Sequence, residues 1–338
     1  MKRIQLWFFL SLLLPGATEL YADAALLLQQ PHSAFGSFNP TGHVAVYLPR
    51  VCAASPTELR RCNAGEKGAV ISRYAGIAGY DWIAIPLMPY LYAVENPDQV
   101  PAAVDREAVA LLRDGYRRTH LRAIVPDTQD GLAPKGDWTQ LVGAAYDRKI
   151  YGFVFETGEA ADSALIEWLN ARPNKKRFNI FFENCADFSK DIINFYYPKA
   201  VRRSILADAG ITTPKQIAKS LVQFHQRRPE MPFSAFVIAQ VEGNLKRSKS
   251  VRGVFESLLR SKKYAVPLAV VYPWAAVGGT VAYIIGGRFN PEKHATEVYG
   301  PAELAGCLLA AQTACRQAEP AEANAVFDAG HAPAAPAP

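Results

Sequence analysis

One of the five cysteines in this chain is the residue best suited to do chemistry. The cysteines are Cys52, Cys62, Cys185, Cys307 and Cys315. Cys52 and Cys62 are ten positions apart in a polar segment, and Cys307 and Cys315 are eight apart, so either pair can close a small disulfide loop. Cys185 is then left over. A leftover cysteine is either a buried thiol that packs like a small hydrophobic residue or a reactive nucleophile.

The residues around Cys185 predict that it lies in the first turn of a helix. Asn184 is a favoured N-cap residue, and Pro198 ends the segment. An apolar stripe at helical spacing lies between them, formed by Phe188, Ile192, Phe195 and Tyr196. Free backbone N–H groups and the helix dipole stabilise negative charge at this position. We therefore expect a lowered pKa for the Cys185 thiol, and a shift of about two units would make the thiolate the majority form at neutral pH.

A histidine far upstream is the best candidate for a base. His43 begins a β-rich run, residues 43–48, that follows Gly42 and stops at Pro49. An imidazole beside the thiol would lower its pKa further and would accept its proton. The other five histidines lie outside the two motifs, and we expect His32, in the loop upstream of His43, to be a surface residue.

The elements that must position this pair follow an α+β pattern. Further strands are expected at residues 69–74, 82–87, 149–156 and 178–182. Helices are expected at residues 103–120, 137–147 and 162–171, and from 213 onward. Residues 31–41 and 50–68 are typical of loops.

Two short segments together resemble a known family. Residues 41–47, TGHVAVY, and residues 183–188, ENCADF, resemble the circularly permuted branch of the NlpC-type papain-like superfamily, to which the lecithin retinol acyltransferase-like proteins belong. In that branch the strand histidine precedes the cysteine, and the cysteine follows an asparagine and opens a helix. The resemblance covers roughly residues 31–198. It implies a permuted papain-like domain, with an antiparallel sheet packed on the cysteine helix, and thiol chemistry on amide or ester bonds of cell-wall peptides, other peptides or lipids.

The resemblance also implies a polar residue that orients the imidazole, on the strand after the histidine strand. Ser72, Tyr74 and Asp81 are candidates by position, and we prefer Ser72 because its neighbours would then share the opposite face. The backbone N–H of Cys185 would supply one oxyanion donor. Asn184 is a candidate for the second, although an N-cap role competes for its side chain.

Neither a metal nor a nucleotide cofactor is implied. The sequence contains no HExxH segment, no phosphate-binding loop and no glycine-rich dinucleotide fingerprint, and the cysteines lack the pairing of a zinc site. The formal net charge of +6 with 20% charged residues does not indicate a nucleic-acid binder, although it fits contact with anionic lipid or an anionic wall polymer.

The N-terminal residues predict export. Lys2 and Arg3 precede an apolar run at residues 4–14, and the small residues at 22–24 suit a cleavage point, so we interpret residues 1–24 as a signal peptide rather than a retained anchor. Export to the periplasm or cell envelope would permit disulfides.

The chain changes character after the papain-like domain, which we assign to residues 25–200. Residues 201–300 are expected to form a helical region, and residues 301–338 a tail rich in alanine and proline. Residues 264–287 carry no charge and follow a basic run that starts at residue 246. Spanning, surface-docking and soluble forms all fit this segment, with membrane contact through residues 246–287 favoured.

The favoured hypothesis is an exported cysteine hydrolase or acyltransferase that acts on an amide- or ester-containing envelope substrate through a Cys185 acyl-enzyme. The main rival is a catalytically inactive envelope-associated binding or structural protein that keeps the same fold. A third hypothesis places the function of a membrane-anchored protein in residues 201–300.

Overall fold

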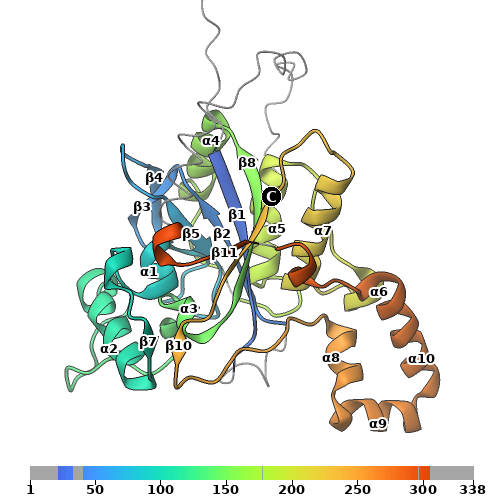
Figure 1. The fold of residues 1–338 in the computed structure, drawn as a ribbon. Helices are drawn as coiled ribbons and strands as arrows, with labels where there is room; N and C mark the ends of the chain where they lie inside the picture. The colour runs from blue at the N-terminus through green and yellow to red at the C-terminus, as the bar shows by residue number, and fades with distance from the viewer. Residues whose placement is uncertain (1–21, 33–40, 177, 296, 305–338) are drawn as a thin grey trace, which may run out of the picture.

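The computed structural model describes residues 22–32, 41–176, 178–295 and 297–304 as an α+β fold built on one seven-stranded sheet (Figure 1). The strand order is β11-β9-β8-β1-β2-β5-β6, and every pair is antiparallel except β11 with β9. The strands are β1 (Ala22–Gln29), β2 (His43–Leu48), β5 (Ala69–Ser72), β6 (Ile83–Pro86), β8 (Ile150–Thr157), β9 (Ala235–Ile238) and β11 (Glu297–Tyr299). The predictions for β2, β5, β6 and β8 are confirmed to within two residues.

Two small sheets lie beside the main one. They pair β3 (Val51–Ser55) with β4 (Glu58–Arg61), and β7 (Ala103–Val104) with β10 (Glu242–Gly243). The α-helices are α1 (Leu87–Tyr92), α2 (Arg106–Tyr116), α3 (Ala144–Asp147), α4 (Glu159–Asn170), α5 (Cys185–Tyr196), α6 (Ile205–Asp208), α7 (Pro214–Gln226), α8 (Val254–Arg260), α9 (Lys262–Val271) and α10 (Pro273–Ala282). Shorter turns of helix are η1 (Pro97–Gln99), η2 (Arg117–Leu121), η3 (Asp137–Gln140), η4 (Tyr283–Gly287) and η5 (Pro291–Lys293).

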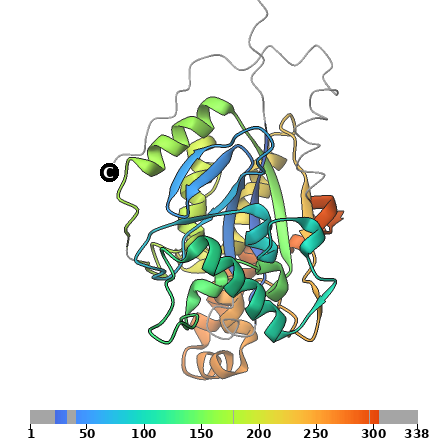
Figure 2. The ribbon, with the colours of Figure 1, turned by 90° about the vertical axis from the view of Figure 1, so that its left-hand side faces the viewer.

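The sheet separates two hydrophobic cores, and β1 lies near its centre with both faces covered. Leu26 and Leu28 face the core that α4, α5 and α7 complete, whereas Ala25 and Leu27 face the core that α1, α2 and α3 complete. Figures 1 and 2 show these helix groups on opposite sides of the sheet. A strand buried on both faces has no polar alternation, which is why residues 25–28 appear continuously apolar in the sequence.

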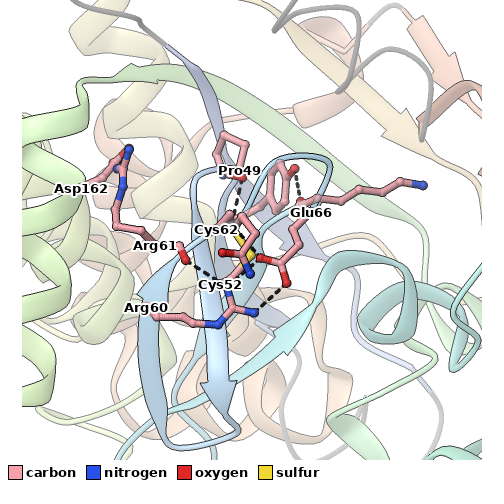
Figure 3. Close-up of a disulfide and its surroundings, with 10 residues drawn as sticks. Pro49, Cys52, Arg60, Arg61, Cys62, Glu66 and Asp162 are labelled. Atoms are coloured by element: carbon pink, nitrogen blue, oxygen red, sulfur yellow. Dashed lines mark hydrogen bonds and ion pairs between the residues drawn. A yellow bond between two sulfur atoms is a disulfide. The ribbon is translucent and has the colours of Figure 1, made fainter.

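The expected loop at residues 50–68 instead contains the hairpin of β3 and β4. Cys52 and Cys62 form a disulfide across this hairpin, as one of the two predicted pairings requires (Figure 3). Next to it, the Arg60 guanidinium holds the Glu66 carboxylate through two contacts of 2.6 Å. The sequence did not predict these two strands, because the hairpin is buried on only one side and many of its side chains are polar or charged. Cys307 and Cys315 lie outside the described residues.

Three other predicted elements differ in the structure. The helix expected at residues 137–147 is divided by Gly143, whose positive φ of 72° breaks the helix into η3 and α3. The helix expected at residues 103–120 begins only at Arg106, because Asp105 caps it by accepting from the Ala108 N–H at 2.8 Å. The strand expected at residues 178–182 is a turn, in which a single bridge joins Asn179 and Glu183.

The region after residue 200 is not only helical. It contributes β9 and β11 to the main sheet and β10 to a small one, so the boundary predicted at residue 200 does not separate two cores. The apolar segment 264–287 forms most of α9, all of α10 and η4, with the chain turning at Tyr272. Among the residues that the structure describes, no helix combines the length and apolar character needed to cross a membrane.

The predicted signal peptide falls mostly on residues 1–21, which lie outside the described residues. Its expected end at residue 24 overlaps the first three residues of β1. Ala24 is fully buried in the core, so a cut before Ala22 would leave the strand whole, whereas a cut after Ala24 would shorten it.

Candidate active site

His43 lies at the start of β2, and the glycine before it sets the direction in which the strand begins. Gly42 has a φ of +78°, and a Cβ built on it would lie 2.2 Å from the backbone oxygen of Gln29. Only glycine fits both the backbone conformation and this close approach. Because Gln29 is also the β1 partner of His43, the same contact fixes the register that places the imidazole. The His43 side chain is 8% exposed.

Ser72, the last residue of β5, lies beside the imidazole. Its Oγ is 2.9 Å from His43 Nε2 and 2.9 Å from the carbonyl oxygen of Val44. A serine hydroxyl has one hydrogen, and a carbonyl oxygen can only accept. Both contacts are hydrogen bonds only if Ser72 donates to Val44 and accepts from a protonated Nε2. This arrangement selects the Nε2–H tautomer and leaves Nδ1 of His43 as the basic nitrogen.

Tyr74 packs against one face of the imidazole ring. Its ring stacks on that of His43 with a centroid distance of 4.9 Å and an interplanar angle of 22°. Tyr74 is 5% exposed, so the imidazole is fixed in its plane by a packed aromatic ring as well as by Ser72. Of the three residues considered for orienting the imidazole, Ser72 hydrogen bonds it and Tyr74 stacks on it.

The third of these residues, Asp81, has a structural role. It receives two hydrogen bonds from the Arg73 guanidinium, at 2.6 and 3.0 Å. Arg73 also donates to Glu183 Oε2 at 3.0 Å and to the backbone oxygen of Asn184 at 3.5 Å. Asp81 and Arg73 therefore tie the end of β5 to the start of the cysteine helix.

The helix begins as the sequence predicts, with Asn184 as its N-cap. Asn184 Oδ1 accepts from the N–H groups of Ala186 and Asp187 at 2.8 and 3.0 Å, and its Nδ2 donates to the carbonyl oxygens of Ile180 and Thr212. Both ends of the amide are occupied by these bonds, so the side chain serves the cap rather than an oxyanion hole. Cys185 is then the first residue of α5.

The Cys185 sulfur lies against the backbone of the histidine strand. The backbone N–H groups of Val44, Ala186 and Cys185 lie near enough to favour the thiolate, and each lowers the pKa of the thiol. The Val44 N–H belongs to the peptide bond that joins His43 to Val44. The thiol and the imidazole, 142 positions apart in the sequence, are therefore brought to the same end of β2.

The expected activation of the thiol by lowering of its pKa is wrong for this structure. Burial raises the pKa of Cys185 to about 11, and the N–H groups around the sulfur offset this only in part. Burial, with a smaller contribution from the Arg148 charge, lowers the pKa of His43 to about 3. Cys185 is 7% exposed, so desolvation outweighs the helix terminus. Both groups are neutral at pH 7.

Sequence reasoning missed a buried polar cluster beside this pair. Arg148 is 5% exposed and donates from Nη1 to Gln29 Oε1 at 3.0 Å. Gln29 in turn donates from Nε2 to the hydroxyl of Tyr90. Arg148 also affects the pKa values of both His43 and Cys185. The signal that could have revealed the cluster is the pair Gln29 and Gln30 directly after the apolar run of residues 24–28, since buried polar residues need partners.

Two further expectations can be compared with the structure. His32 is not a surface residue: it is 8% exposed, and burial together with the Arg148 charge lowers its pKa to about 4. Cys52, Cys62 and Glu66 have ligand atoms within 4.8 Å of one another, but the two sulfurs are joined as a disulfide. A disulfide sulfur has no thiolate charge to offer, so this cluster does not fit a zinc site.

No protein-family model, no curated protein and no solved structure matches this chain. The chemistry of the site is therefore inferred from its own geometry.

Proposed function

We propose that this chain is a thiol hydrolase or acyltransferase of permuted papain-like architecture, with Cys185 as nucleophile, His43 as base and Ser72 as the residue that orients the base. The observation that carries the proposal is the hydrogen bond between Ser72 and His43 Nε2, at 2.9 Å, together with the sulfur at the adjoining peptide N–H. This combination brings the imidazole and the thiol to the same end of β2, as a thiol–imidazole pair requires.

The reaction begins from a neutral pair. His43 Nδ1 takes the thiol proton as the Cys185 sulfur attacks the carbonyl carbon of an amide or ester. The tetrahedral intermediate collapses when the leaving amine or alcohol takes the proton from His43, and a thioester remains on Cys185. Water or an acceptor nucleophile then gives its proton to His43, attacks the thioester carbonyl and releases the acyl group, and the thiol recovers its proton.

Backbone donors at the sulfur would stabilise the oxyanion of the intermediate. The N–H groups of Val44 and Cys185 are near the thiol and lower its pKa, whereas the N–H of Ala186 also donates to the Asn184 side chain. When the sulfur forms its bond to the carbonyl carbon, the negative charge develops on the carbonyl oxygen. The N–H groups of Val44 and Cys185 can then donate hydrogen bonds to that oxygen.

The proposed substrate class rests on the chemistry of a thioester-forming cysteine and on the predicted export. A thioester-forming cysteine acts on amide or ester carbonyls, and the Cys52–Cys62 disulfide is consistent with an oxidising compartment outside the cytosol. The proposed substrates are amide- or ester-containing molecules of the cell envelope, among them wall peptides and acyl lipids.

One observation favours a second function, a binding or structural protein without catalysis. The raised pKa of Cys185 and its 7% exposure describe a thiol that is neither ionised nor open to solvent in this structure. The same fold would then hold a ligand without attacking it.

Acyl-enzyme formation separates the two functions. The purified chain is mixed with p-nitrophenyl esters of short and long acyl acids and with peptidoglycan peptides, and intact mass is followed after acid quench. The proposal expects a thioester on Cys185 that is lost in Cys185→Ala but not in Ser189→Ala. Ser189 is fully buried one helical turn later on α5, and its hydroxyl has no hydrogen-bond partner among the described residues. A folded Cys185→Ala protein that keeps every cellular phenotype would overturn the catalytic assignment.

A further inference from the structure

The helices α9 and α10, with η4, carry an exposed apolar surface that no part of the described chain covers. Nine of the sixteen exposed large hydrophobic residues of the described chain lie within residues 266–285, and we call these nine the apolar tip. They are Val266, Val270, Val271, Tyr272, Trp274, Val277, Val281, Ile284 and Ile285. Trp274 is 86% exposed, the highest value among them. Such a concentration is unusual, because scattered single hydrophobic residues are the rule on protein surfaces.

Within the segment that carries the apolar tip, the charges have one sign. Residues 257–291 contain no aspartate or glutamate, but they contain Arg260, Lys262, Lys263 and Arg288. The nearest upstream acid, Glu256, is 5% exposed and pairs with Lys215 at 2.6 Å and with Arg260 at 3.1 Å. The exposed side of this region is therefore apolar with a cationic border.

The apolar tip projects from the body of the protein. Figures 1 and 2 show α8, α9 and α10 at the end of the molecule opposite α4. Two glycines of α10 and η4 pack closely against neighbouring segments. A Cβ on Gly279 would lie 3.1 Å from the Phe255 ring, and one on Gly287 would lie 3.5 Å from Ala207. Gly279 and Gly287 thus face inward, whereas the nine residues of the apolar tip are exposed.

A hollow of about 350 Å³ opens between α8, α9 and α10 on the same region, lined by apolar side chains that include Leu259, Ala269 and Val281. Its lining has no charged residue. A hydrocarbon chain is the kind of group that such a hollow accepts without leaving a polar group unsatisfied.

We propose that the apolar tip docks this protein on the surface of an anionic phospholipid bilayer. Tyr272 and Trp274, at the turn between the helices, would lie at headgroup level, since amphipathic aromatic rings concentrate there. The valines and isoleucines would reach the acyl chains, and the cationic border would contact the phosphates. With 10 residues each, α9 and α10 are about 15 Å long, half the thickness of a bilayer core of about 30 Å. The inference does not depend on the thiol chemistry.

A second copy of this chain is the competing occupant of the surface. Arg260 already pairs with Glu256 at 3.1 Å, so two copies joined through the apolar tip would bring six further cations together, Lys262, Lys263 and Arg288 of each copy, and residues 257–291 contain no acidic residue. An anionic bilayer supplies the opposite charge as well as the apolar phase, so charge complementarity favours the bilayer.

The test is sedimentation of the full chain with vesicles of phosphatidylcholine and phosphatidylglycerol at 3:1, compared with pure phosphatidylcholine. The expected result is binding to the anionic vesicles that weakens as salt is raised from about 50 to 500 mM. A Trp274→Ser/Val270→Ser double variant should bind about 10- to 100-fold more weakly, because two side chains no longer enter the apolar phase. A Lys262→Gln/Lys263→Gln variant should lose about 25-fold on anionic vesicles only.

A matched control uses exposed apolar residues far from the apolar tip. Leu111 and Leu132 are 67% and 64% exposed, so Leu111→Ser/Leu132→Ser removes comparable apolar surface and should leave vesicle binding unchanged. Quenching of tryptophan fluorescence by brominated lipid gives an independent readout, which Trp274→Phe should abolish. Vesicle binding that is equal in the tip and control variants would overturn the proposal. So would a concentration-dependent dimer that the tip variant abolishes while no variant binds vesicles.

Discussion

Ser72 Oγ accepts a hydrogen bond from His43 Nε2 at 2.9 Å and donates one to the Val44 carbonyl oxygen, also at 2.9 Å. This relationship determines which imidazole nitrogen is basic. The same two hydrogen bonds link the start of β2 to the end of β5, so they also connect two neighbouring strands of the sheet.

Replacing Ser72 with alanine should reduce acyl-enzyme formation by about 10- to 100-fold, since the imidazole loses the acceptor that fixes its tautomer. Stability should fall by about 1 kcal/mol, because the buried Val44 carbonyl loses a donor. Ser189→Ala is the control and should be neutral in both measurements. Nitrogen NMR of His43 checks the mechanism: the variant should show a mixture of tautomers, and an unchanged Nε2–H signal would contradict this account.

Replacing Gly42 with alanine should be more harmful than the same change at another left-handed glycine. Gly42 and Gly131 have φ values of +78° and +71°, so both variants carry a similar backbone strain. Only the Gly42 Cβ meets another atom, the Gln29 oxygen at 2.2 Å, while nothing lies within 4 Å at Gly131. We expect the Gly42 variant to lose at least about 1 kcal/mol more in urea unfolding and to displace His43. Equal losses would show that the close approach is not a constraint.

Acid should destabilise the protein through His43. The unfolded imidazole takes a proton below about pH 6.5, whereas burial lowers the folded pKa to about 3. The unfolded state therefore binds more protons in this window, and stability falls as the pH drops, by up to about 1.4 kcal/mol per pH unit. His32, with a pKa of about 4, adds a second contribution. The variant His43→Gln should reduce this slope between pH 6 and 4.5 in denaturant titrations, and a slope equal to that of the wild type would contradict the prediction.

Reduction of the Cys52–Cys62 disulfide should lower stability by about 3 kcal/mol, the chain-entropy value for a loop of this length. Thermal unfolding with and without dithiothreitol measures the effect. The double variant Cys52→Ala/Cys62→Ala should have the lower melting temperature and should not respond to the reductant. A wild-type protein that is equally insensitive would mean that the bond adds nothing to the hairpin.

Local patterns predicted the positions of Cys185 and His43 better than the ionisation of their side chains. Asn184 caps its helix and His43 begins its strand because both depend on neighbours within a few residues. The pKa of Cys185 depends on what the whole fold places around it, and burial reversed the effect expected from the helix terminus.

Two other misses have different causes, one a set of local side-chain hydrogen bonds and the other a partner far away in the sequence. Residues 178–182 have β-forming side chains, but the chain turns there because Asn179 Oδ1 accepts from the Phe181 N–H at 2.8 Å and the Asn184 side chain bonds Ile180. Arg148 gave no local sign of being buried, since its partner Gln29 is 119 positions away.

The most direct test of the central claim is the alkylation rate of Cys185 by iodoacetamide, measured by peptide mass spectrometry from pH 6 to 11 in the wild-type protein and in His43→Ala. If His43 takes the thiol proton, the wild type reacts at least tenfold faster at pH 7, and the two rates converge as the pH approaches the raised thiol pKa of about 11. Identical rates for the two proteins across the whole range would contradict the pairing. A wild-type rate that is already constant below pH 7 would contradict the neutral resting state.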